Sequence, residues 1–247
     1  MSHRIGDIVR DAAKRIPGAR STVYLSIALR QMAADAWREP ASFDRVFEST
    51  PDPWNSRSRS EQERFKITEE LLTEAHPGRF GRAFEAGCAE GVFTERLATN
   101  CDELIAADYS AVALERAQTR LRSFPHVRVI QWDARRDTPP GAFDLVVAMG
   151  VLTALLRPAS VRRACAAFVD ALIPGGTLLF SDARQTTMFE NAWWGRYVLR
   201  GGEQIRRELS RHPQLTCRGT RSTDTHVFAV FAKNAGTLAN PAASRSP

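Results

Sequence analysis

The feature that most constrains this chain is an alternation of short apolar runs with helical stretches between residues 83 and 181. Strands that alternate with helices pair in parallel through right-handed crossovers, and the helices cover both faces of the sheet. The sequence therefore predicts a doubly wound α/β domain. The predicted strands are Ala83–Glu85, Glu103–Asp108, Val127–Trp132, Phe143–Met149 and Thr177–Ser181, and the predicted helices between them are Val92–Thr99, Ala111–Phe124 and Pro158–Leu172.

The two ends of the chain have other patterns. Apolar residues at helical spacing predict two helices before the α/β region, residues 5–16 and 23–37, the second ended by Pro40. Turn-forming residues predict a loop over 48–60, and a helix follows from about Glu61 to Ala75. We therefore expect an N-terminal helical extension over residues 1–47.

Two β-like runs near the C-terminus, Leu215–Ser222 and His226–Lys233, lie close enough in sequence to form an antiparallel hairpin at the sheet edge. They bring a mostly parallel sheet to seven strands. We expect the α/β domain to span residues 48–235. The small, polar segment 236–247 is expected to be a disordered tail.

Composition excludes several classes. No run of eighteen apolar residues and no signal-peptide core is present, so we expect a cytoplasmic protein without a membrane partner. The four cysteines are scattered without a C-x-x-C pair, which suggests neither a zinc site nor a disulfide framework. The net charge of +6 is spread along the whole chain, so a nucleic-acid partner is not favoured.

The stretch FEAGCAEGVFTERLA, residues 84–98, joins the first predicted strand to its helix. Gly87 and Gly91 permit a tight turn and close backbone approach, and the helix N-terminus offers free N–H groups. The spacing is not G-x-G-x-x-G, and Glu85 stands at the strand end. That carboxylate disfavours a dinucleotide pyrophosphate and favours a ligand with a cationic amino group.

Two more acids follow at the ends of the next two strands. Asp108 is placed to accept the two hydroxyls of a ribose, and Asp133 can accept from an adenine amino group, with Trp132 or Ala134 beside the ring. Any one such acid is as often a helix cap or a solvated turn. Three in succession favour adenosine joined to an amino acid, which is S-adenosylmethionine.

With these residues in place, the chain resembles class I S-adenosylmethionine-dependent methyltransferases, which have a Rossmann-like sheet, and specifically the nodulation protein S (NodS) family. The resemblance runs from about Asp52 to Lys233. The motifs that carry it are DPW at 52–54, SRSEQ at 58–62, EAGCAEGVFTERLA, FDLVVAMGVL at 143–152, the PGG-TLLFSDAR run from Pro174, and WG with a later GGE between residues 194 and 203.

The resemblance implies methyl transfer to a substrate heteroatom, in that family an amino-sugar nitrogen, and no metal. It implies that Glu85, Gly87 and Gly91 line the methionine part of the cofactor, Asp108 the ribose, and Asp133 with Ala134 the adenine. Trp54 and its loop cover the cofactor. Cys88, Tyr109 and Met149 complete the predicted cofactor-binding set. Because no lysine or histidine adjoins Cys88 in sequence, we expect its thiol to pack rather than react.

One departure from the family concerns the acceptor. Where family members tend to carry an acid followed by aromatic residues after the fourth strand, this chain has Gly150-Val151-Leu152-Thr153-Ala154. A base is needed elsewhere, because an ammonium has no lone pair. We predict Asp182 or His226 in this role, with Glu190 and Tyr197 as further candidates; Asp182 is as readily a cap or a partner of Arg184. The aromatic segment 189–197 is either core or a wall of the acceptor site.

Several functions stay open at this point. We expect an N-methyltransferase of a small molecule, an amino sugar or a related specialised metabolite. The alternatives are an O-methyltransferase, a scaffold that keeps the fold without catalysis, and an RNA methyltransferase, which net charge alone favours.

Overall fold

The computed structural model describes residues 40–155, 158–184 and 201–235. The predicted helices before Pro40, the aromatic segment 189–197 with Glu190 and Tyr197, and the predicted disordered tail lie outside these residues.

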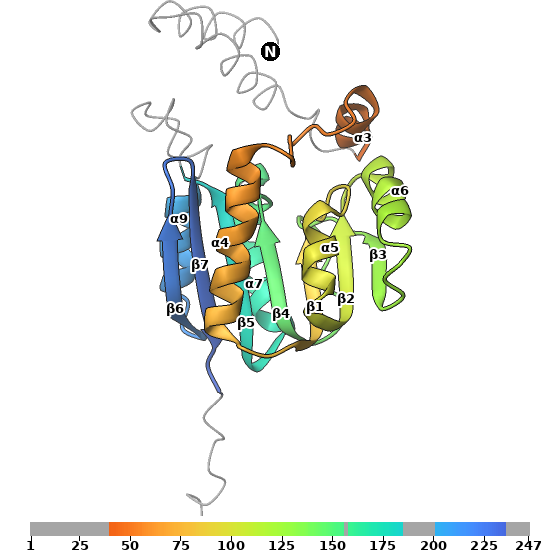
Figure 1. The fold of residues 1–247 in the computed structure, drawn as a ribbon. Helices are drawn as coiled ribbons and strands as arrows, with labels where there is room; N and C mark the ends of the chain where they lie inside the picture. Colours follow the sequence, from red (N-terminus) through yellow and green to blue (C-terminus); the bar gives the residue numbers. More distant parts are fainter. Residues whose placement is uncertain (1–39, 156–157, 185–200, 236–247) are drawn as a thin grey trace, which may run out of the picture.

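A seven-stranded sheet forms the centre of the molecule, with the strand order β3-β2-β1-β4-β5-β7-β6 (Figure 1). All pairs are parallel except β5–β7 and β7–β6, which are antiparallel. The predicted fold class, with its C-terminal antiparallel hairpin, is confirmed. The strands are β1 (Phe80–Ala86), β2 (Cys101–Asp108), β3 (Val127–Gln131), β4 (Phe143–Met149), β5 (Leu172–Ala183), β6 (Leu215–Ser222) and β7 (His226–Lys233).

Helices cover both faces of the sheet (Figure 1). Phe65, Leu71 and Leu72 of α4 pack with Phe93 and Leu97 of α5 on one face. Residues of α7 and α9 pack on the opposite face, among them Val161, Phe168 and Ile205. The helices are α3 (Pro40–Ser49), α4 (Arg59–Ala75), α5 (Val92–Ala98), α6 (Ala111–Arg120), α7 (Pro158–Ala171) and α9 (Gly202–Ser210), with a short 3₁₀ turn, η2 (Leu152–Ala154). None of the helices in the described ranges is long and apolar enough to cross a membrane.

Pro40, expected only to end the helix 23–37, is itself the first residue of a further helix, α3, and the residues before it lie outside the described ranges. Proline suits that position, since the first N–H groups of a helix have no intrahelical partner. The expected loop over 48–60 is correspondingly shorter. The Ser110 hydroxyl, at the start of α6, donates to Asp44 of α3 at 2.6 Å, so α3 is fastened to the α/β domain.

The order of strands fixes where a ligand can bind. From β1 the chain moves outward to β2 and β3, and then returns to place β4 on the other side of β1. Neighbouring crossovers therefore leave in opposite directions at the β1–β4 boundary, which opens a crevice beyond the carboxyl ends of these strands. Glu85 and Met149, near the ends of β1 and β4, lie at this crevice.

Candidate functional site

A cavity of about 400 Å³ lies at the carboxyl ends of the central strands. Its walls come from the turns after strands β1 to β5, from α3, from the loop before α4 and the first turns of α4, and from the start of β7. Of the predicted binding or reacting residues that lie within the described ranges, all but Gly91 line it: Trp54, Glu85, Gly87, Cys88, Asp108, Tyr109, Asp133, Ala134, Met149, Asp182 and His226.

The two glycines of the first turn are required by geometry. Gly87 has a φ of 75°, and a Cβ there would stand 2.4 Å from Cγ2 of Val151. Gly91 has a φ of 78° and precedes α5, where a Cβ would stand 3.1 Å from Cδ1 of Leu121. Gly91 therefore lets α5 pack closely beside α6, behind the cavity wall.

Glu85 is a buried acid without a complete set of partners. Its residue is 2% exposed, and its Oε2 atom has no hydrogen-bond partner among the described residues. Burial raises the pKa of Glu85 to about 7, and the nearby charge of Asp108 adds to the rise. A cation bound in the cavity would supply the missing partner and favour the ionised carboxylate.

Asp108 is held by the backbone of two turns. Its Oδ2 accepts a hydrogen bond from the amide of Ala89 and its Oδ1 from the amide of Ser110, both at 2.9 Å. Burial raises the pKa of Asp108, and these amide hydrogen bonds oppose the rise. A carboxylate can accept about four hydrogen bonds, so Asp108 keeps acceptor capacity for ligand hydroxyls.

Asp133 belongs to a cluster that the sequence did not predict. Arg135 donates from Nε to Oδ1 of Asp133 at 2.8 Å and from Nη2 to Oδ2 at 2.9 Å. The guanidinium also lies 4.7 Å above the ring of Tyr109 and donates to its hydroxyl. Burial alone would raise the pKa of Asp133, but the hydrogen bonds from Arg135 outweigh it and lower the pKa. The Asp133 oxygens that accept from Arg135 must therefore also accept any hydrogen bond from the amino group of a bound adenine.

Trp132 has a different place from the one expected beside an adenine ring. It lines the cavity, but its ring stacks on Phe168 at 5.9 Å and meets Phe84 edge-on at 5.3 Å, within the core. Because the Trp132 ring packs in the core, Ala134 is the better placed of the two residues expected beside an adenine ring. Its small side chain leaves space in the cavity for a planar ligand.

Arg64 of α4 is a functional candidate that sequence reasoning missed. Its Nη2 atom pairs with Glu61 at 2.5 Å, and its Nη1 lies 3.4 Å from where a Cβ on Gly150 would stand. Its Nε is buried without a hydrogen-bond partner among the described residues. The cavity wall therefore offers a guanidinium beside Gly150, in the segment 150–154 where the sequence lacks an acid.

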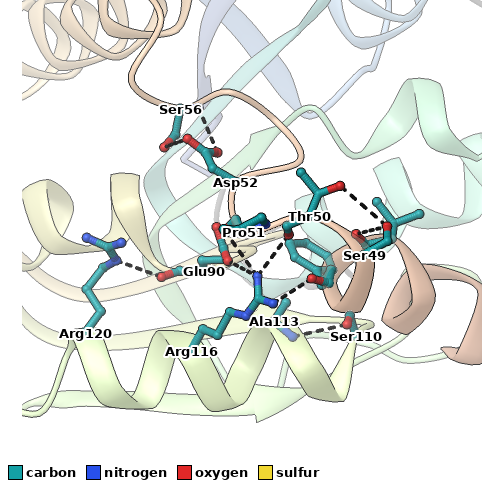
Figure 2. Close-up of polar contacts among 12 residues, drawn as sticks. Ser49, Thr50, Pro51, Asp52, Ser56, Glu90, Ser110, Ala113, Arg116 and Arg120 are labelled. Atoms are coloured by element: carbon teal, nitrogen blue, oxygen red, sulfur yellow. Dashed lines mark hydrogen bonds and ion pairs between the residues drawn. The ribbon is translucent and has the colours of Figure 1, made fainter.

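Arg116 fastens the loop that follows α3, and Asp52, Trp54 and Ser56 of this loop line the cavity. Figure 2 shows the contacts of Arg116. Arg116 of α6 donates from Nη1 to the carbonyls of Thr50 and Pro51, both at 3.2 Å, and pairs with Glu90 at 2.5 Å. Its Nη2 donates to the carbonyl of Phe47 at 2.6 Å. We call these contacts of Arg116 the Arg116 clamp. Trp54, a few residues further along the same loop, is 48% exposed and meets the ring of Phe47 edge-on at 6.1 Å. Trp54 thus stands over the cavity on a loop that side-chain bonds hold in place.

The two predicted catalytic residues differ in their surroundings. Asp182 is buried, and its carboxylate accepts from the amide and the hydroxyl of Thr153 and from the amide of Ala183. Burial raises the pKa of Asp182, and the Thr153 bonds oppose the rise. Its observed contacts are those of a cap on η2, one of the two structural roles expected for it; no hydrogen bond joins it to Arg184 among the described contacts.

His226 is a neutral group at physiological pH. Its half-buried ring has Nδ1 2.9 Å from the hydroxyl of Thr225. Burial lowers the pKa of His226 to about 4, and the charge of Arg64 contributes. The imidazole can therefore accept a hydrogen bond without adding a second positive charge to this part of the wall.

Cys88 has the character of a packing residue. Its side chain packs with Ala106 and Leu114, and burial together with the charges of Asp108 and Glu85 raises the pKa of its thiol. A thiol with a raised pKa is a poor nucleophile. The environment of Cys88 thus agrees with the expectation that it packs.

The sequence matches the family described as Nodulation protein S (NodS) over residues 45–236. It is 30% identical over 188 residues to a nodulation protein S of Sinorhizobium fredii, covering 74% of this chain and 84% of that protein. It is 36% identical over 166 residues to a ubiquinone biosynthesis O-methyltransferase of Methylococcus capsulatus, covering 65% of this chain and 61% of that protein.

The fold is also similar to that of N-methyltransferase NodS from Bradyrhizobium japonicum, crystallised in complex with S-adenosyl-L-homocysteine. The TM-score is 0.65 at 28% sequence identity, and the match covers 81% of this chain and 96% of the other. The family match begins within α3 and ends after β7, so it spans every strand of the sheet.

Proposed function

The chain belongs to the nodulation protein S (NodS) family, and on that premise we propose that it is a cytoplasmic enzyme that transfers a methyl group from S-adenosylmethionine to a nitrogen of a small molecule, an amino sugar or a related specialised metabolite. The structure of the NodS relative with S-adenosyl-L-homocysteine supports the choice of cofactor. The similarity to a nodulation protein S and to a ubiquinone biosynthesis O-methyltransferase supports methyl transfer as the reaction class.

The observation that carries the proposal is the unpartnered oxygen of Glu85, which is 2% exposed and faces a cavity. A cation would stabilise the ionised form of a buried acid in this state, and the methionine part of the cofactor has an ammonium group. The same moiety has a carboxylate, for which Arg64 has unused donors. We assign the ammonium of the cofactor to Glu85 and its carboxylate to Arg64. In this arrangement Arg64 gives up part of its ion pair with Glu61 and pairs with the cofactor carboxylate instead.

The remaining cofactor contacts follow along the strand ends. The amides of Ala89 and Ser110 fix the carboxylate of Asp108 in place, and its remaining acceptor capacity is available to the ribose hydroxyls. Asp133 and Ala134 line the far end, where we place the adenine. Trp54 and Phe47 close the cavity above it.

When bound, the cofactor supplies a methyl group on a sulfonium: the acceptor nitrogen forms the new C–N bond, the C–S bond breaks, and its electron pair stays on sulfur. The chain must hold the acceptor amine in its neutral form and in line. The burial that lowers the pKa of His226 also disfavours an ammonium beside it. We propose that neutral His226 accepts a hydrogen bond from the amine and so orients its lone pair toward the methyl group, and that the proton of the methylated product passes to solvent. Asp182 holds the turn Leu152–Ala154.

A matched pair of acceptors tests this function. D-glucosamine offers a free amine and hydroxyls, whereas N-acetyl-D-glucosamine offers the hydroxyls without the free amine. With methyl-labelled cofactor, we expect label on the nitrogen of glucosamine and none on the acetylated sugar. Label on oxygen in both sugars would contradict N-methylation and indicate an O-methyltransferase.

A further inference from the structure

A second hollow of about 450 Å³ adjoins the cofactor cavity, between the start of α4 and the turn that joins β6 to β7. Polar side chains form most of its wall. These are the hydroxyls of Ser60, Ser222, Thr223 and Thr225 and the carboxylates of Glu63 and Asp224. We call this hollow the hairpin groove.

Arg64 and His226 line both the hairpin groove and the cofactor cavity. These two side chains therefore form the boundary that the groove and the cavity share. His226 is the residue to which we assign the hydrogen bond from the acceptor amine. A groove lined by His226 is thus close enough to receive the part of the acceptor beyond its reacting nitrogen.

The hydroxyls of the groove are arranged in advance. The Thr223 hydroxyl accepts from the amide of His226 at 3.0 Å and from the amide of Thr225 at 3.3 Å. The Thr225 hydroxyl lies 2.9 Å from Nδ1 of His226 and 3.4 Å from the Thr223 hydroxyl. These bonds fix the turn and leave hydroxyl groups at the rim, where they can exchange hydrogen bonds with ligand hydroxyls.

The charged side chains that line the groove are mostly acidic. Its two carboxylates, Glu63 and Asp224, share the described wall with one charged cation, Arg64, which is paired with Glu61. Arg184 is not a wall residue, but its Nη1 donates to the carbonyl of Thr223 at 3.4 Å. The other basic residue of the described wall, His226, is neutral at physiological pH because burial and the charge of Arg64 lower its pKa to about 4. Such a wall attracts a cationic ligand and repels an anionic one.

We propose that the hairpin groove holds the body of the methyl acceptor, and that this acceptor is a polyhydroxylated molecule with a second basic nitrogen in addition to the one that is methylated. Hydroxyls of the ligand pair with the serine and threonine rim, and the second ammonium lies between Glu63 and Asp224. The inference rests on the proposed function and narrows its substrate class.

Two amino-sugar dimers test the second nitrogen. One is the β-1,4-linked glucosamine dimer with two free amines, and the other carries one free amine and one N-acetyl group. The sugar ring that receives the methyl group is the same in both. We expect the ratio kcat/KM to be about tenfold higher for the diamine, through KM, since one more charge pair forms in the groove. Equal KM values for the two dimers would overturn the proposal.

Glu63→Gln and Asp224→Asn test the location. Each is expected to raise KM for the diamine about threefold and to leave kcat, and KM for the mono-acetylated dimer, nearly unchanged, because an exposed charge pair contributes modestly. Glu70→Gln is the matched control: it removes an exposed acid from the same helix, outside both hollows. A rise in KM as large in Glu70→Gln would show a general charge effect and contradict the groove.

A binding measurement separates this inference from the proposed function. Calorimetry of the diamine dimer with protein saturated with S-adenosyl-L-homocysteine requires no chemistry. If neither dimer is methylated but the diamine binds and the Asp224→Asn variant weakens it, the function fails and the groove stands. If methyl transfer occurs but the two groove variants bind the diamine as tightly as wild type, the function stands and the groove fails.

Discussion

The end of the cavity beside β1 and β2 is built from groups close in sequence, whereas the end beside α4 and β7 is built from distant ones. Asp108 accepts from the amides of Ala89 and Ser110, in the turns after these two adjacent strands. At the other end, Arg64 and His226 are 162 positions apart by their residue numbers and meet only in the folded chain. The difference suggests that the local end recognises the shared cofactor and the distant end recognises the acceptor.

The largest effect that we expect tests the end of the cavity beside β1 and β2, and it concerns the pH dependence of stability. The pKa of Glu85 is about 7 in the folded protein and near 4.5 when unfolded, so between these values the folded state retains a proton that the unfolded state has lost. The free energy of unfolding of the cofactor-free protein then falls by about 3 kcal/mol from pH 4.5 to above 7. Glu85→Gln removes this loss, and urea unfolding should find it more stable than wild type at pH 8 by about that amount.

The same variant must bind the cofactor less tightly, because a neutral amide cannot balance an ammonium. Glu70→Gln, which changes an exposed acid, is the control and should follow wild type at every pH. If the free energy of unfolding of Glu85→Gln varied with pH as that of wild type does, burial would not raise the pKa of Glu85.

The ribose position predicts the next effect. Asp108→Ala should raise the dissociation constant of S-adenosyl-L-homocysteine about ten- to a hundredfold, since charge-assisted hydrogen bonds contribute about 1.5–3 kcal/mol. Calorimetry measures this directly. Asp102→Asn, an exposed acid at the opposite end of β2, should bind as wild type does. An unchanged dissociation constant for Asp108→Ala would place the ribose elsewhere.

The two ends also differ in how far the sequence could predict them. Glu85, Asp108 and the glycine turn follow from one strand, one turn and one helix, so local patterns placed them on the cavity. Nothing in the neighbourhood of Arg64 indicates that α4 crosses the sheet so that its guanidinium meets Gly150. Likewise, the strand-end position of Asp182 predicted a base, but its bonds to Thr153 depend on how η2 folds back. Tertiary packing decides such roles.

The glycine at the junction of the two ends gives the third effect. A methyl on Gly87 would stand 2.4 Å from Val151, while one on Gly175, whose φ of 82° is equally positive, meets nothing within 4 Å. Both alanine variants suffer the backbone strain, so the difference between them isolates the clash. Gly87→Ala should unfold with a free energy about 1–3 kcal/mol lower than Gly175→Ala. Equal values in urea titrations would mean that Val151 moves aside without cost.

At the distant end, His226→Phe keeps an aromatic ring and removes the nitrogen acceptors. We expect kcat for glucosamine to fall about tenfold, which is roughly 1.4 kcal/mol, with the affinity for S-adenosyl-L-homocysteine unchanged. His226→Asn should recover part of the rate, since its amide oxygen can accept a hydrogen bond. A loss of cofactor affinity equal to the loss of rate would contradict the assignment of the cofactor to one end of the cavity and of the acceptor to the other.

The smallest effect concerns the loop that closes over the local end. Arg116→Gln removes the guanidinium that joins the carbonyls of Phe47, Thr50 and Pro51 to Glu90 (Figure 2). Because this clamp is partly exposed, its loss should cost only about 0.7 kcal/mol and speed the release of S-adenosyl-L-homocysteine about threefold. Stopped-flow fluorescence can follow release through Trp54, which adjoins Phe47. Arg122→Gln, which removes an exposed arginine near the end of α6, is the control; equal release rates in the two variants would show that α6 does not hold the loop through Arg116.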